Sequence, residues 1–232
     1  MRSILIPLGI AVGGYLLGSV SSARLVGRRA VPGDDLLATD LPVPGSSEIW
    51  TYRGVSATSL LGRGRIRWGL LVIVLDALKA LIPTLAVHLA WPDGSWHLVA
   101  GAAVLTGHVY PVWHRFRGGR GQACLLGAML VINPVVIPAV LVAGAIVGLL
   151  FFTSGYTARN GSAFFLIPWY AIGQGWGPGL WFSLWVCGIY ILAIVPDVRE
   201  EVRVQRALGT FSLGYWERLR TAWADFTDRT AA

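Results

Sequence analysis

Long apolar runs fill most of this chain, and short polar loops that collect the arginines separate them. Of the 232 residues, 55% are hydrophobic and only 13% are charged, and the mean hydropathy is +0.62, so the chain is far more apolar than an ordinary soluble domain. A soluble fold has too little interior for this much apolar surface. The pattern therefore predicts an integral membrane protein with membrane lipids as its solvent.

The apolar runs predict an all-α protein with about seven transmembrane helices. The expected crossings lie at residues 4–26, 68–91, 97–113, 122–132, 135–153, 163–172 and 180–195. The fourth and sixth are too short to cross about 30 Å of hydrocarbon as straight helices, so we expect them to be tilted, broken or re-entrant. A cleaved signal peptide is the alternative for the first run. Residues 1–195 thus form one transmembrane domain with a long loop at 27–67, and residues 196–232 form a charged tail.

The arginines predict the orientation of the chain. With the N-terminus outside, the loop at 27–67, the loop at 114–121, the loop that holds Arg159 and the tail all lie in the cytoplasm, as the excess of basic residues on that side requires. An aromatic belt then falls at the outer interface and consists of Trp91, Trp96, Trp176 and Trp181.

The net charge and the cysteines exclude two classes of function. The charge of +7 is scattered between apolar runs and forms no separate polar domain, so nucleic acid is not an expected partner. Cys124 and Cys187 lie in apolar stretches without the spacing of a zinc site or a disulfide framework. We expect both to be packing residues and expect no metal.

The stretch from Arg115 to Gly121 is the most informative loop. Glycines allow backbone N–H groups to approach an anion, and arginines add charge and paired donors. The predicted phosphate ligands are Arg117, Gly118, Gly119, Arg120 and Gly121. The alternative, an arginine anchor with a flexible turn, leaves the three glycines unexplained.

Three ionisable residues inside the predicted spans are candidates for a role in the site. Asp76 and Lys79 lie three residues apart on one helix face, where a pair costs less than either charge alone, and the pair is either structural or functional. His108 precedes the glycine-rich loop and has either a catalytic or a positioning role. The buried charges alone would also suit a small transporter, but few polar residues continue towards the outer face.

The long first loop offers a second anion-binding stretch, with Arg53, Ser56, Thr58 and Ser59 placed among glycines. A solvated loop that ends in the basic residues Arg63, Arg65 and Arg67 explains the pattern equally well.

Together the motifs resemble one family, the acyl-phosphate-dependent integral-membrane glycerol-3-phosphate acyltransferases of bacteria, of which the chain looks like a divergent member. The resemblance covers nearly the whole chain. Its motifs are Gly18-Ser19 with Ser22-Ala23, Leu75 to Lys79, Gly107 to Pro111, Phe116 to Gly121, and Ser154 to Tyr156.

The resemblance implies transfer of a fatty acyl group from acyl phosphate to the 1-hydroxyl of glycerol 3-phosphate, which gives lysophosphatidic acid and phosphate for phospholipid synthesis. It implies no cofactor or metal, a multi-pass location in the bacterial inner membrane, and no particular protein partner. In this scheme Arg117 and Arg120 hold phosphate.

The chain also departs from the family pattern. Tyr52 to Ser59 stands at the family's first glycine, serine and asparagine motif and keeps only an alanine and a threonine, unless Gly45-Ser46 is the matching pair. Thr157, a candidate catalytic residue, stands at one of two family serines. The tail lacks the family's histidine and asparagine, with Asp197 and Glu200 as the nearest substitutes. The alternative function is therefore a catalytically impaired homologue that binds lipid or phosphate.

Overall fold

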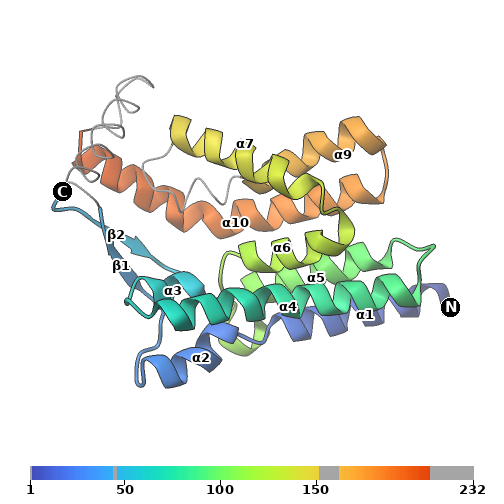
Figure 1. The fold of residues 1–232 in the computed structure, drawn as a ribbon, viewed down its shortest axis with the longest axis horizontal. Helices are drawn as coiled ribbons and strands as arrows, with labels where there is room; N and C mark the ends of the chain where they lie inside the picture. Colours follow the sequence, from blue (N-terminus) through green and yellow to red (C-terminus); the bar gives the residue numbers. More distant parts are fainter. Residues whose placement is uncertain (1, 44–45, 152–161, 210–232) are drawn as a thin grey trace.

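The computed structural model describes residues 2–43, 46–151 and 162–209 (Figure 1). Thr157 and Arg159 lie outside these ranges. The elements are α1 (Arg2–Gly18), α2 (Ser22–Ala30), β1 (Thr39–Pro42), β2 (Ile49–Tyr52), α3 (Ala57–Leu61), α4 (Ile66–Ala90), α5 (Trp96–Val109), η1 (Val112–His114), α6 (Gln122–Ile132), α7 (Val136–Phe151), η2 (Ser162–Phe165), α9 (Leu166–Gln174) and α10 (Pro178–Ala207).

The long helices form two packed groups. Helices α1, α4, α5 and α6 pack against one another, and α7, α9 and α10 lie over them, with α10 in contact with α5 (Figure 1). The main core lies between the groups and includes Val104, Cys124 and Tyr190, all fully buried. Glycines let the helices approach closely, since a Cβ on Gly107 would collide with the carbonyl oxygen of Tyr15 in α1.

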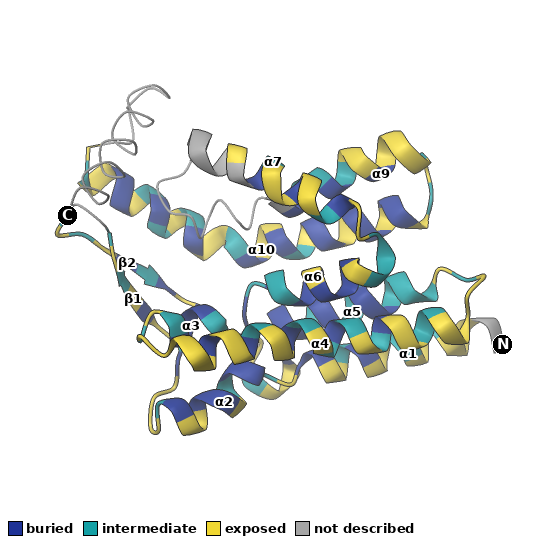
Figure 2. Ribbon diagram, in the orientation of Figure 1, coloured by how far each residue is buried: buried dark blue, intermediate teal, exposed yellow. Residues whose placement is uncertain are grey.

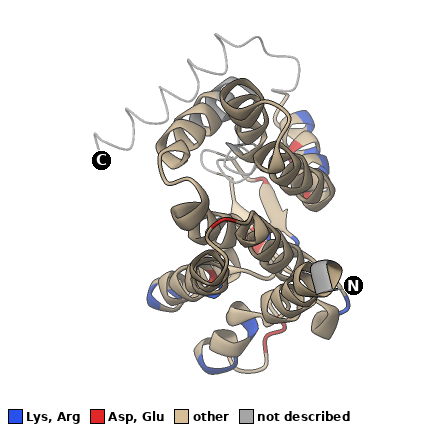
Figure 3. Cartoon of the chain, turned by 90° about the vertical axis from the view of Figure 1, so that its right-hand side faces the viewer, with Lys and Arg blue, Asp and Glu red and all other residues tan. Residues whose placement is uncertain are grey.

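Exposed residues cover the outward faces of the helices (Figure 2), and many of them are large hydrophobic side chains. Ile4 is 69% exposed, Leu89 70% and Ile172 87%, an arrangement that suits lipid rather than water. Most of the helical ribbon carries neither acidic nor basic residues (Figure 3). Three segments are long and apolar enough to cross a membrane, namely Ile4–Ala30, Ile66–Ala90 and Pro178–Ala207. The number of seven crossings and the orientation stay predictions.

Two expectations about the first 67 residues were wrong. The predicted helix at 4–26 is not continuous, because α1 ends at Gly18 and the Ser21 side chain accepts a hydrogen bond from Arg24 N to begin α2. The fold is also not all-α, since β1 and β2 pair as an antiparallel hairpin with Thr39 opposite Tyr52. The long loop is thus an ordered structure.

The predicted short segment at 122–132 is helix α6, which is capped by Asn133, and the segment at 163–172 is divided between η2 and α9. The predicted last span at 180–195 is longer than expected. Helix α10 passes through Pro196 and continues to Ala207, so the charged start of the tail is a direct extension of the span.

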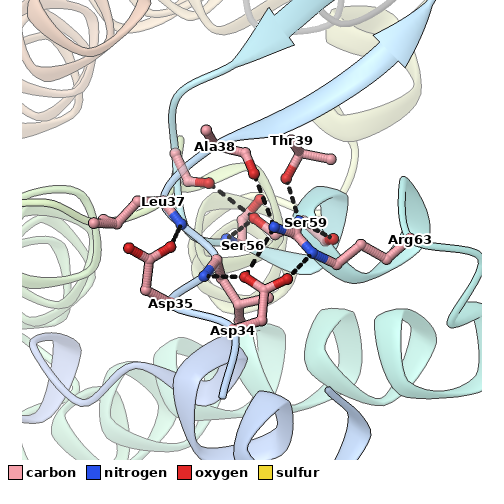
Figure 4. A network of polar contacts seen from close by, with 10 residues as sticks. Asp34, Asp35, Leu37, Ala38, Thr39, Ser56, Ser59 and Arg63 are labelled. Atoms are coloured by element: carbon pink, nitrogen blue, oxygen red, sulfur yellow. Dashed lines mark hydrogen bonds and ion pairs between the residues drawn. The ribbon is translucent and has the colours of Figure 1, made fainter. Parts of the chain in front are cut away.

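Arg63 ties the hairpin to α3 (Figure 4). Its Nε donates to Asp34 Oδ2 at 2.5 Å, and its Nη1 donates to Thr39 Oγ1 at 2.6 Å and to the Ser59 carbonyl at 2.9 Å. This guanidinium is committed to backbone and side-chain partners of its own loop. Arg63 is therefore a structural residue, which neither alternative for this part of the loop had anticipated.

The arginine-bearing loops meet at one end of the molecule. Arg24 in α2 donates to the carbonyl of Arg117 at 2.8 Å, and Arg203 in α10 pairs with Glu48 beside the hairpin. The turns between α4 and α5 and between α9 and α10 lie at the opposite end (Figure 1), and the four predicted belt tryptophans lie in these turns or in the first turn of the helix that follows. This separation is the one that the arginine distribution predicts.

Candidate functional site

The glycine-rich loop folds back onto the end of α5. Gly119 N donates to the His108 carbonyl at 3.3 Å, and the Gly118 carbonyl accepts from Val55 N at 3.0 Å. A Cβ on Gly118 would collide with the carbonyl of His108, and Gly121 has a φ of +82°, so both positions require glycine. The loop is thereby fixed between α5 and the segment that leads into α3.

Arg120 is held from two sides. Its Nε donates to Asp197 Oδ2 and its Nη2 to Asp197 Oδ1, both at 2.6 Å, in a bidentate pair with α10. The guanidinium carbon lies 5.2 Å from the centre of the Tyr52 ring. Burial lowers the pKa of Arg120, but the hydrogen bond to Asp197 outweighs this effect and raises that pKa above its ordinary value. Arg120 is therefore a permanently charged group in a nearly buried position.

On one side of Arg120 lies a cavity of about 470 Å³, here called the anion pocket. Arg53, Arg117 and Arg120 line it together with Gly54 and Gly118. Arg53 and Arg117 are solvent-exposed. Three arginines from two loops thus border one cavity, an arrangement that suits recognition of a phosphate.

On the other side of Arg120 lies a cavity of about 300 Å³, here called the apolar groove. Its polar end contains Arg120, Ser56 and Thr58, and its remaining wall is formed mainly by aliphatic side chains of α6 and α7, including Met129 and Val140. Arg120 and Gly121 therefore stand where a charged pocket meets a space suited to a hydrocarbon chain.

A buried polar cluster lies next to the glycine-rich loop. Lys79 Nζ lies 2.9 Å from Asp76 Oδ1, 2.9 Å from His108 Nδ1 and 3.0 Å from the carbonyl of Val20. Ser22 Oγ donates to Asp76 Oδ1 at 2.7 Å. The ammonium uses its three protons on these acceptors, so the cluster joins the α1–α2 connection, α4 and α5.

This cluster fixes the tautomer of His108. An ammonium can only donate, so in its contact of 2.9 Å with Lys79 Nδ1 accepts and the ring proton is on Nε2; Nδ1 also lies 3.5 Å from Asp76 Oδ1. A Cβ on Gly119 would lie 2.5 Å from Nε2, which shows how closely the ring approaches the glycine-rich loop. His108 also lines the apolar groove, so its Nε2–H is a hydrogen-bond donor at the site rather than a base.

Asp76, His108 and Cys124 place their ligand atoms within 4.8 Å of one another, as a metal site would. The Lys79 ammonium, however, already contacts both the carboxylate and the imidazole. A cation next to these groups would be repelled by Lys79, so the cluster fits an internal ion pair better than a metal centre.

The hydroxyl residues of the first loop have different positions. Ser56 caps α3 and shares a hydrogen bond of 2.9 Å with Tyr52 OH, while Thr58 lines the groove. Ser59 is fully buried and donates to the Gly54 carbonyl at 2.8 Å, so its hydroxyl shapes the backbone behind the anion pocket.

Sequence reasoning missed the role of Tyr52, whose ring lies under Arg120. It did single out Asp197 as a nearby candidate, and the structure brings this residue to Arg120, whereas Glu200 accepts from Thr51 N in β2 at 3.0 Å. No spacing rule connects residue 120 to residue 197, so only their shared family context could have suggested this contact.

Comparison with known proteins decides the family. The model of the glycerol-3-phosphate acyltransferase family matches residues 8–208. The chain belongs to this family. A glycerol-3-phosphate acyltransferase of Thioalkalivibrio sulfidiphilus is 33% identical over 88% of this chain and 92% of its own length. One of Dehalococcoides mccartyi, glycerol-3-phosphate acyltransferase 4, is 36% identical over 72% of this chain and 82% of its own length.

A solved structure supports the fold. The crystal structure of PlsY (YgiH), an integral membrane glycerol 3-phosphate acyltransferase in its glycerol 3-phosphate form, aligns with a TM-score of 0.66 over 92% of this chain and 98% of that one, at 23% identity. This likeness supports the same fold for the two chains.

Proposed function

We propose that this protein is a membrane acyltransferase that transfers a fatty acyl group from acyl phosphate to glycerol 3-phosphate and so makes lysophosphatidic acid for phospholipid synthesis. The observation that supports this proposal most is the position of Arg120 between the anion pocket and the apolar groove. A substrate with a phosphate head and a long acyl chain needs both spaces next to each other.

In this proposal the acyl chain lies in the apolar groove and the phosphate groups lie on the arginine side. Arg120 contacts the phosphate of the acyl donor, and Arg53 and Arg117 bind the phosphate of the acceptor. The N–H groups of Gly118, Gly119 and Gly121 and the hydroxyls of Ser56, Thr58 and Ser59 either contact phosphate or hold the backbone around it.

The reaction forms an ester bond and breaks an acyl–phosphate bond. The 1-hydroxyl oxygen of the acceptor attacks the acyl carbonyl carbon, phosphate departs with the electron pair of the broken C–O bond, and the hydroxyl proton ends on the released phosphate. Negative charge develops on the carbonyl and leaving-group oxygens, and fixed donors next to them lower the barrier. His108 Nε2–H and the Arg120 guanidinium are the donors that we assign to this step.

Thr157, which the resemblance places in a catalytic motif, remains a proposed catalytic residue. Lys79 acts through His108 in this account, because it contacts Nδ1, and Asp76 holds Lys79 in place; neither lines the anion pocket, while Asp76 borders the apolar groove. The proposed location is the bacterial inner membrane, with seven crossings and the arginine-bearing end in the cytoplasm.

Purified protein in lipid nanodiscs, supplied with palmitoyl phosphate and radiolabelled glycerol 3-phosphate, tests the proposal. We expect labelled lysophosphatidic acid and release of one phosphate per product, with a loss of at least 100-fold (about 2.7 kcal/mol) for Arg120→Ala. Arg28→Ala, which removes an exposed arginine of α2, serves as the control and should retain activity.

Binding of glycerol 3-phosphate by the wild-type protein, without formation of lysophosphatidic acid, would instead support the catalytically impaired homologue that binds lipid or phosphate. Flux of glycerol 3-phosphate into sealed liposomes without acyl transfer would support the transporter. Each outcome contradicts the acyltransferase proposal.

A further inference from the structure

Asp197 is the least expected member of the site, because it is an acidic residue at a place that must bind anions. It is 2% exposed and lies in the part of α10 that continues beyond the apolar span. Both of its carboxylate oxygens accept hydrogen bonds from Arg120 at 2.6 Å. A carboxylate in this position either competes with the substrate for Arg120 or positions Arg120 for it.

Which nitrogen atoms of Arg120 bind Asp197 decides between competition with the substrate and positioning of Arg120. The pair uses Nε and Nη2, which form one edge of the guanidinium. Nη1 lies on the other edge, 3.2 Å from where a Cβ on Gly54 would stand, and Gly54 lines the anion pocket. Among the described residues Nη1 has no hydrogen-bond partner. One edge of Arg120 is thus fixed by protein, and the other lies beside Gly54, a residue of the anion pocket.

We propose that Asp197 is a positioning residue that fixes one edge of the Arg120 guanidinium on α10 and so presents Nη1 to the substrate phosphate. This inference rests on the proposed function, since it assigns the substrate as the ligand of Nη1. A free arginine side chain samples many rotamers, whereas a bidentate pair leaves the guanidinium plane one orientation. Tyr52, stacked under Arg120, restricts the same plane.

The rest of α10 explains why Asp197 is a rigid anchor. One turn later, Glu200 accepts a hydrogen bond from the backbone of Thr51 in β2, and Arg203 donates to the carbonyl of Ile49. The same helix therefore fixes both the hairpin that carries Tyr52 and the loop that carries Arg120. Leu192 and Pro196 of this helix also line the anion pocket, so α10 forms its rear wall.

The matched comparison is between Asp197→Asn and Glu201→Gln. Both change a carboxylate that is 2% exposed to its isosteric amide, four residues apart on one helix, but Glu201 bonds Gln205 and lines neither cavity. We expect Asp197→Asn to lower kcat/KM for the acyl phosphate by about 10-fold to 100-fold, and Glu201→Gln to stay within about twofold.

Two further measurements exclude a general loss of folding. The melting temperature of each variant in detergent reports stability, and Asp197→Glu, which restores the charge, should recover part of the activity. In an Arg120→Ala background, Asp197→Asn should cause no further loss, because Asp197 acts only through Arg120. A similar loss in both backgrounds, or an Asp197→Asn protein that is as active as wild type or more active, would overturn the inference.

The affinity of the same proteins for inorganic phosphate, measured by calorimetry, tests the role of Asp197 independently of turnover. If the wild-type protein produced no lysophosphatidic acid, the proposed function would fail, while weaker phosphate binding by Asp197→Asn would still support the positioning role. Equal phosphate binding by the wild type and Asp197→Asn would reject that role whatever the activity.

Discussion

Lys79→Met is the substitution that tests the buried cluster most severely. Lys79 and Asp76 have side chains only 10% and 4% exposed, and the ammonium donates to three acceptors. Methionine retains most of the volume but leaves the Asp76 carboxylate as an unpaired buried charge. Breaking a buried pair in this way costs about 3–5 kcal/mol. We therefore expect a large loss of stability from one nearly isosteric change.

Unfolding of the detergent-solubilised protein in urea, followed by tryptophan fluorescence, measures this cost. The double variant Lys79→Met with Asp76→Asn should be more stable than Lys79→Met alone, with a coupling free energy of about 2 kcal/mol. Arg203→Ala, which removes an arginine that is 48% exposed together with its pairs to Glu48 and Glu200, should cost less than the change at Lys79 and serves as the surface control. Additive losses in the double variant would refute the account of the cluster.

Three further changes probe the loop, the groove and the hairpin. Gly119→Ala should lower activity at least about tenfold, measured by phosphate release, because its Cβ would displace the His108 ring; wild-type kinetics would contradict this close approach. Met129→Trp, at a buried wall of the groove, should reduce turnover of a sixteen-carbon donor about tenfold more than that of an eight-carbon donor; equal losses would place the chain elsewhere. The hydrogen bond from Arg63 holds the pKa of Asp34 below its usual value. The pair therefore stabilises the loop at pH values above the ordinary pKa of a carboxyl, and this contribution is lost as the pH falls through the lowered pKa of Asp34. Proteolysis should show the loop opening at acid pH in the wild type, with a weaker pH dependence in Arg63→Ala.

The sequence predicted a mostly helical chain with apolar helices because apolar runs report their own length, while the seven crossings stay a prediction. The short helix α6 matches its predicted bounds, since Asn133-Pro134 ends it in the sequence as it does in the fold. The break after Gly18 and the hairpin were not predictable in this way. The run through Val26 remains apolar enough to hide the break, and the hairpin depends on tertiary partners such as Arg63.

In the candidate site, too, local features could be predicted from the sequence and contacts between distant segments could not. The glycine-rich loop could be assigned from local chemistry, because three glycines among arginines have few structural explanations. The convergence of Arg53 with Arg117 and Arg120 joins two loops, and the pairing of Arg120 with Asp197 joins residues 77 apart in the chain. Such contacts follow from helix packing, which the periodicity of a single sequence does not encode.

A structure of the protein with glycerol 3-phosphate and a non-hydrolysable acyl phosphonate would test the central claim most directly. The account predicts a phosphorus-bound oxygen within about 3 Å of Arg120 Nη1, the acceptor phosphate between Arg53 and Arg117, and the acyl chain along α6 and α7 in the groove. A head group bound away from Arg120, or an acyl chain outside the groove with the arginines still in place, would contradict it.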